Sequence, residues 1–176
     1  MSPSPAAVPL LRDLGGIEAR RDALIAELEG LPAETRVRAP EPGVWSPNQV
    51  VEHLVAAERF VLRSLFHEGD RKSRPRSLKN RILHRVVVWI LRSPIPVKVP
   101  VEGMDPTGGR QLSDLVPEWR ETHGLLRDFL ENASPADMES ACLMHPVAGP
   151  LTPGNAVEMM GTHLDRHAAQ IRRRLG

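Results

Sequence analysis

Four long segments of the chain carry apolar residues at intervals of three and four, the spacing that places side chains on one face of an α-helix. No convincing alternation of apolar and polar residues, the pattern of a half-buried strand, competes with this spacing. The sequence therefore predicts an all-α fold, a four-helix bundle with a short additional helix between the second and third long helices. The long helices are expected at residues 10–31, 46 to about 68, 113 to about 132 and 152–175, and the short helix at 78–92.

Two of the long helices have matching start signals. Ser46 can cap the second helix, with Pro47 at the first helical position and Gln49 completing a capping box. Thr152 and Pro153 repeat the arrangement at the start of the last helix. These two starts are therefore the best-defined helix boundaries in the sequence.

The chain is long enough to bury the core of one domain. We expect a single helical domain over residues 10–176 and a loosely ordered N-terminus at residues 1–9, where Pro, Ser and Ala dominate. The net charge is +1 and there is no Tyr, so neither a strong positive field nor aromatic stacking favours nucleic acid as a partner.

The sequence also indicates the cellular compartment of the protein. The lone Cys142 rules out an internal disulfide framework and suits a reducing cytoplasm. The N-terminus lacks the pattern of a signal peptide, and the longest apolar run, VVVWIL at 86–91, is too short to span a bilayer. We therefore expect a cytoplasmic protein without a transmembrane segment.

The second helix carries two polar residues where apolar ones are expected. At 100° per residue, Glu58 falls inside the apolar arc and His53 on its shoulder, whereas Glu52 falls on the solvent side with Arg59 and Arg63. Burying an unpaired carboxylate is costly, so Glu58 should have a partner such as an arginine, a histidine or a metal ion.

The last helix carries a histidine pair. His163 and His167 are four residues apart and share one face of the helix, so both imidazoles can bind one metal ion. His53, near the start of the second helix, is the best candidate for a third ligand. Three protein ligands leave a position open for water or substrate, which is typical of catalytic metal sites.

Three stretches carry a family resemblance: WSPNQVVEHLVAAE (45–58), HPVAGPLTP (145–153) and HLDRHAAQI (163–171). Together they resemble the DinB-like superfamily of metal-binding four-helix bundles. That superfamily includes the YfiT-like metal-dependent hydrolases and the S-transferases that use bacillithiol or mycothiol. The resemblance covers about residues 10–175.

The resemblance implies both a site and a chemistry. It implies that His53, His163 and His167 hold a divalent metal ion, for which three imidazoles suit zinc, nickel or iron. It also implies a small-molecule substrate, a low-molecular-weight thiol as cosubstrate for the S-transferases, and a homodimer.

Several alternatives stay open at this point. The leading hypothesis is a metal-dependent enzyme, either a thiol S-transferase or a hydrolase, and the alternative is a non-catalytic binding module. In that module the metal is structural or absent, and the apolar groove and the helix at 78–92 bind a partner protein or a lipid. The basic segment 71–92 suits a membrane surface or nucleic acid, and its apolar spacing suits equally a helix laid over the bundle or a dimer contact.

Individual side chains keep open roles as well. Glu58 can orient a ligand histidine, act as a general base or pair with an arginine. Gln170 lies near the face of His167 and can contact it. His145 can either reach the site or cap a backbone carbonyl.

Overall fold

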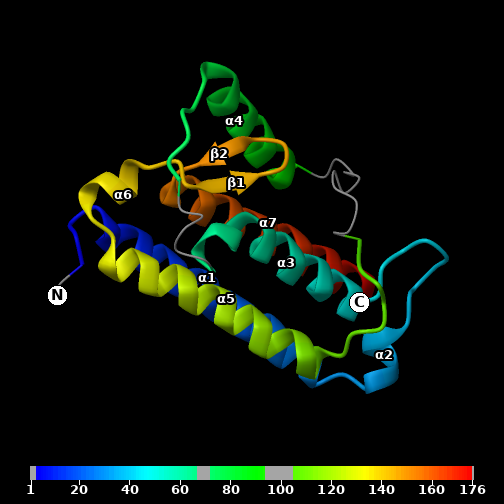
Figure 1. Cartoon of the computed structure of the whole chain (residues 1–176). Coiled ribbons are helices and arrows are strands. Elements are labelled where there is room, and N and C mark those ends of the chain that lie inside the picture. The colour runs from blue at the N-terminus through cyan, green and yellow to red at the C-terminus, as the bar shows by residue number, and fades with distance from the viewer. Residues whose placement is uncertain (1–2, 67–71, 94–104, 176) are drawn as a thin grey trace.

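The computed structural model describes residues 3–66, 72–93 and 105–175, which are mostly helical (Figure 1). This confirms the helical class predicted from the apolar spacing. The elements are α1 (Ala7–Glu29), α2 (Ala33–Val37), α3 (Pro47–Leu62), the 3-10 helix η1 (Arg63–Leu65), α4 (Leu78–Arg92), α5 (Leu112–Asn132), α6 (Pro135–Glu139), β1 (Leu143–His145), β2 (Gly149–Leu151) and α7 (Pro153–Leu175).

The four long helices surround one core. Helix α1 packs against α5 and α7, and α3 packs against the same two helices on the other side. Their apolar faces meet in the middle, where Trp119 is the largest fully buried side chain. This packing brings α3 and α7, the two helices with predicted metal ligands, into direct contact.

The predicted helix starts at Ser46 and Thr152 are confirmed. The Ser46 hydroxyl accepts a hydrogen bond from the backbone N–H of Gln49 at 3.3 Å, and the Gln49 side chain accepts one from the N–H of Ser46 at 2.8 Å. At α7 the Thr152 hydroxyl accepts from the N–H of Asn155 at 3.4 Å. These bonds satisfy backbone donors that the first turn of a helix leaves free.

Other boundaries differ from the prediction. Helix α1 begins at Ala7, which is fully buried, so residues 7–9 belong to the helix and not to a loose N-terminus. Helix α3 gives way to η1 at Arg63, and Glu68 lies outside the described residues. Helix α5 begins at Leu112 and not after Ser113, because Gln111 takes the capping position and its N–H donates to the Asp114 carboxylate at 3.3 Å.

The connector between α5 and α7 departs from the predicted all-α fold. It contains α6 and a two-stranded antiparallel hairpin in which Leu143 pairs with Leu151. Gly149 has φ 74°, a left-handed conformation that glycine adopts without steric cost. Strands of three residues are too short to show periodicity, which is why the pattern missed them.

The predicted helix at 78–92 is confirmed as α4. It packs on α7 and contacts β2, and in Figure 1 it stands with the hairpin, away from the pair formed by α1 and α5. Within the described ranges, none of the helices combines the length and the apolar character that crossing a bilayer requires.

Candidate metal site

The three predicted ligands meet between α3 and α7. His53 lies in the second turn of α3, and His163 and His167 lie one turn apart on α7. The Nε2 atom of His163 is 3.3 Å from that of His53 and 3.0 Å from that of His167. Nitrogens bound about 2.0–2.1 Å from one metal ion, at angles near 90–110°, lie about 2.9–3.4 Å apart. Both separations fit this range, and the ligand atoms of all three histidines lie within 4.8 Å of one another, so the cluster could hold a metal ion.

The protonation of these rings also suits metal binding. Burial, together with His167 and His53, lowers the pKa of His163 well below its usual range. Burial and the nearby His53 lower the pKa of His167 to about 4. Both rings are therefore neutral at pH 7, and a neutral imidazole offers the lone pair that a metal ion needs.

Gln170 contacts His167 on the side away from the cluster. Its side-chain oxygen lies 2.7 Å from Nδ1 of His167. When His167 binds metal through Nε2, Nδ1 keeps its proton and can donate it to this oxygen. The contact that the sequence left open is therefore present.

The same amide also lies next to Arg174. If the amide is turned over, its nitrogen donates to Nδ1 of His167 and its oxygen accepts from Nη1 of Arg174 at 3.0 Å. That orientation suits a ring protonated at Nε2, whose Nε2 atom cannot bind metal, whereas the first suits a ring protonated at Nδ1. Metal binding through Nε2 therefore requires the orientation in which Gln170 presents its oxygen to His167.

Glu58 is buried, as predicted, and its partners are on α5. One carboxylate oxygen, Oε2, accepts a hydrogen bond from Nε1 of Trp119 at 2.7 Å and lies 2.8 Å from Nε2 of His123. The other oxygen, Oε1, is buried and has no hydrogen-bond partner among the described residues. The expected histidine partner therefore exists, but it is His123 and not one of the predicted ligands.

The sequence patterns assign no role to His123. The spacing of Trp119 and His123 could have indicated a shared role, because they are four residues apart and lie on one face of α5. What the sequence lacked was the register between α3 and α5. Only the packing of these helices places that face opposite Glu58.

The predicted exposure of Glu52 is wrong, because the segment that precedes α5 covers that side of α3. Oε1 of Glu52 accepts hydrogen bonds from the backbone N–H of Thr107 at 3.0 Å and from its hydroxyl at 2.7 Å. Oε2 accepts from the N–H of Gly108 at 3.1 Å. Glu52 therefore ties this segment to the helix that carries His53.

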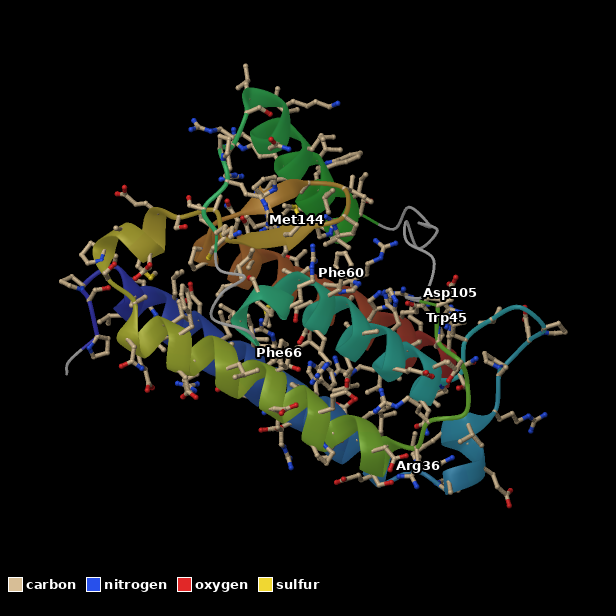
Figure 2. The ribbon with its side chains drawn as sticks, viewed as in Figure 1. Arg36, Trp45, Phe60, Phe66, Asp105 and Met144 are labelled. Atoms are coloured by element: carbon tan, nitrogen blue, oxygen red, sulfur yellow. The ribbon has the colours of Figure 1, made fainter. Side chains whose placement is uncertain are left out.

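A pocket of about 230 Å³ opens beside the three histidines. Its wall is mainly apolar and comes from α3, α4, α7 and the hairpin turn. The lining residues are Trp45, His53, Ala57, Glu58, Val61, Val87, Ile90, Leu91, His145, Pro146, Val147, Ala156, Met159, Met160, His163, Arg166 and His167. Of these lining residues, Figure 2 labels Trp45, which precedes the first turn of α3.

Of the two roles left open for His145, the structure supports the first. His145 lines the pocket, and its Nδ1 atom accepts hydrogen bonds from the backbone N–H groups of Val147 at 3.1 Å and Ala148 at 3.0 Å. It thus caps N–H groups, not the expected carbonyl. Burial, with a smaller effect of His84, lowers the pKa of His145 to about 4, so the ring is neutral at pH 7.

A second, larger hollow of about 890 Å³ adjoins this pocket and shares Trp45, Leu91, Arg166 and His167 with it. Its character is different, because four arginines line it: Arg92, Arg166, Arg173 and Arg174. Arg166 also donates hydrogen bonds from Nη1 to the carbonyls of Ile90 at 2.9 Å and Ser93 at 2.6 Å, and so fixes the C-terminal end of α4 on α7. An apolar pocket and a basic hollow therefore meet at His167.

The model of the DinB superfamily matches residues 17–171 of the chain. No curated protein and no solved structure matches it. The matched range includes all three histidines of the cluster and the helices that carry them.

Proposed function

This chain belongs to the DinB superfamily, and from that membership and the histidine cluster we propose that it is a metal-dependent enzyme acting on an apolar small molecule. His53, His163 and His167 would hold a divalent ion. The observation that carries the proposal is the convergence of three Nε2 atoms at the wall of an apolar pocket. We further propose that α1, α3, α5 and α7 form the four-helix bundle expected of this superfamily.

A divalent ion held there would act as a Lewis acid towards water or a thiol. The remaining steps fall to the chain itself. The apolar wall would desolvate the substrate, and Glu58, with Oε2 held by Trp119 and His123, would present Oε1 as a proton acceptor. The ring of His145, protonated at Nε2 because Nδ1 accepts two backbone hydrogen bonds, would offer a donor to the substrate.

Of the two reaction classes, transfer to a thiol is the one that the neighbouring hollows favour. A two-substrate reaction needs two binding spaces that meet at the reacting centre, and the apolar pocket and the arginine-lined hollow meet at His167. The arginines would bind a polar cosubstrate that carries carboxylates, and the apolar pocket would take the electrophile. Hydrolysis needs only the apolar pocket and is the second candidate.

The first experiment is elemental analysis of tag-free protein purified without chelators. We expect about one divalent ion per chain, lost in the variant with both His163→Ala and His167→Ala while its circular dichroism stays helical. The matched control is His145→Gln, which alters a histidine of the same pocket outside the cluster and should keep the metal. A full metal content in the double variant would contradict the proposed ligands.

Activity is then tested with the metal-loaded protein. Consumption of a low-molecular-weight thiol in the presence of a panel of apolar electrophiles would support S-transfer, whereas turnover of esters or amides without thiol would support hydrolysis. Bound metal with neither activity would favour the binding module, in which the ion serves only the fold.

A further inference from the structure

Helix α4 carries an apolar stripe that the fold leaves uncovered. Leu78, Ile82, Val86 and Trp89 are exposed by 73%, 54%, 41% and 62%. At about 100° per residue these four side chains fall within an arc of about 80°. The described residues include eight large apolar side chains that are exposed. Four of these eight lie on one face of α4.

The opposite side of α4 is held against the rest of the molecule. Nδ2 of Asn80 donates a hydrogen bond to the carbonyl of Ala148 in the hairpin turn, and His84 and Val88 are buried. Arg92 pairs with Glu158 of α7 at 3.2 Å. The rotation of α4 is therefore set by contacts on its inner side, and the apolar stripe faces outward as a consequence.

Positive charge borders the stripe on both sides. Arg81 and Arg85 lie along one edge and Lys79 along the other, all three exposed, and no described carboxylate pairs with them. From residue 72 to residue 92 the chain has seven Lys or Arg and no Asp or Glu, although its net charge is only +1. An apolar stripe between cations, on a helix with many basic residues, is typical of helices that lie in the interface of a bilayer.

We infer that α4 binds the surface of an anionic lipid bilayer, with its apolar stripe in the interface and its cations against the headgroups. Arg81, Arg85 and Lys79 are long enough to reach the phosphates while the stripe enters the acyl boundary. A second copy of the chain is a poorer occupant, because two such faces would bring like charges together. The inner face of the same helix, through Val87, Ile90 and Leu91, forms part of the pocket wall.

The test is sedimentation of the full-length protein with vesicles at low ionic strength. We expect the protein to pellet with vesicles of phosphatidylcholine and phosphatidylglycerol in equal amounts but not with phosphatidylcholine alone. Tryptophan emission should shift to shorter wavelength on binding, and high salt should release the protein, because the Debye length falls from about 10 Å at 0.1 M to about 3 Å at 1 M. The experiment does not depend on the metal site, so its failure leaves the proposed function untouched.

Substitutions on the surface of α4 test whether this helix is the part of the protein that binds the vesicles. Arg81→Gln with Arg85→Gln should weaken the partition coefficient about thirty-fold, because each cation near an anionic surface strengthens binding about five-fold. Trp89→Ser should weaken binding and abolish the emission shift. The matched controls are Val8→Ser, which removes an apolar side chain exposed by 54% elsewhere, and Arg12→Gln with Arg38→Gln, which removes two charges elsewhere.

Three results would overturn the inference. The first is wild-type protein that stays in the supernatant with anionic vesicles at low salt. The second is equal weakening by the control charge variant, which would indicate attraction to the whole surface and not to α4. The third is a concentration-dependent dimer in light scattering that Trp89→Ser abolishes, which would make the stripe an interface between copies.

Discussion

Gln170 is the residue whose contact bears most directly on how His167 can bind a metal ion. Metal binding through Nε2 of His167 requires the Gln170 side chain to present its oxygen to Nδ1, 2.7 Å away, because this orientation holds the tautomer whose Nε2 lone pair is free. Groups that orient a ligand in this way typically contribute about 10- to 100-fold to metal affinity.

We therefore expect Gln170→Leu to weaken zinc binding about 10- to 100-fold without removing a ligand. Competition with a chromophoric chelator measures the affinity. Gln170→Glu, which presents an oxygen to both His167 and Arg174, should restore most of it. An unchanged affinity in Gln170→Leu would mean that the contact does not orient the ring.

The buried contacts of Glu58 predict how its substitution changes the free energy of unfolding. Replacing it with Ala leaves the Trp119 N–H and the His123 ring buried without their acceptor. We expect the free energy of unfolding of the metal-free protein to fall by about 2–3 kcal/mol, because each buried donor left without an acceptor costs about 1–3 kcal/mol. Glu58→Gln keeps an acceptor oxygen and should cost about 1 kcal/mol. Urea unfolding measures both, and equal losses would argue against these hydrogen bonds as the cause.

At the scale of elements, α3 depends on a segment distant in the chain. Glu52 accepts three hydrogen bonds from Thr107 and Gly108, and these connect the helix of His53 to the start of α5. Gly108 has φ 78°, a left-handed conformation that favours glycine, and a Cβ there would lie 3.0 Å from Nε2 of Gln49, so the Gln49 amide would have to shift.

Glu52→Ala should therefore lower the free energy of unfolding by about 2 kcal/mol and speed proteolysis within residues 105–110. The control is Glu121→Ala, which removes an exposed partner of Arg59 and should cost at most about 1 kcal/mol. Urea unfolding and limited trypsin digestion measure the two effects. Equal behaviour of the two variants would show that the anchoring is weak.

At the scale of the whole molecule, several buried histidines make stability depend on pH. Burial lowers the pKa of His145 and His167 to about 4, whereas an unfolded histidine titrates near 6.5. Between these values the unfolded chain binds protons that the folded chain does not. The free energy of unfolding of the metal-free protein should therefore fall as pH falls from about 6.5 towards about 4, and stay level above that window.

We expect the free energy of unfolding to fall by about 2–4 kcal/mol across this window. This is less than two full pKa shifts would give, because both rings line a pocket that solvent can enter. Urea unfolding at a series of pH values measures the loss. His145→Gln removes one of the titrating groups and should make the loss shallower. A stability that does not change between about pH 6.5 and about pH 4.5 would contradict the burial of these rings.

The sequence by itself determined the four long helices, the helix at 78–92 and the identity of the metal-ligand candidates, but not the short helices α2 and α6. Helix caps and apolar spacing depend only on residues near one another in the chain. The capping roles of Ser46 and Thr152, and the one-turn spacing of His163 and His167, could therefore be predicted without knowing the fold. The tertiary structure alone decided which helix faces meet. It placed His123 against Glu58, covered Glu52 with a distant segment and turned the stripe of α4 outward. These contacts join residues far apart in the chain, and no local periodicity encodes the register between two helices or the path of a loop.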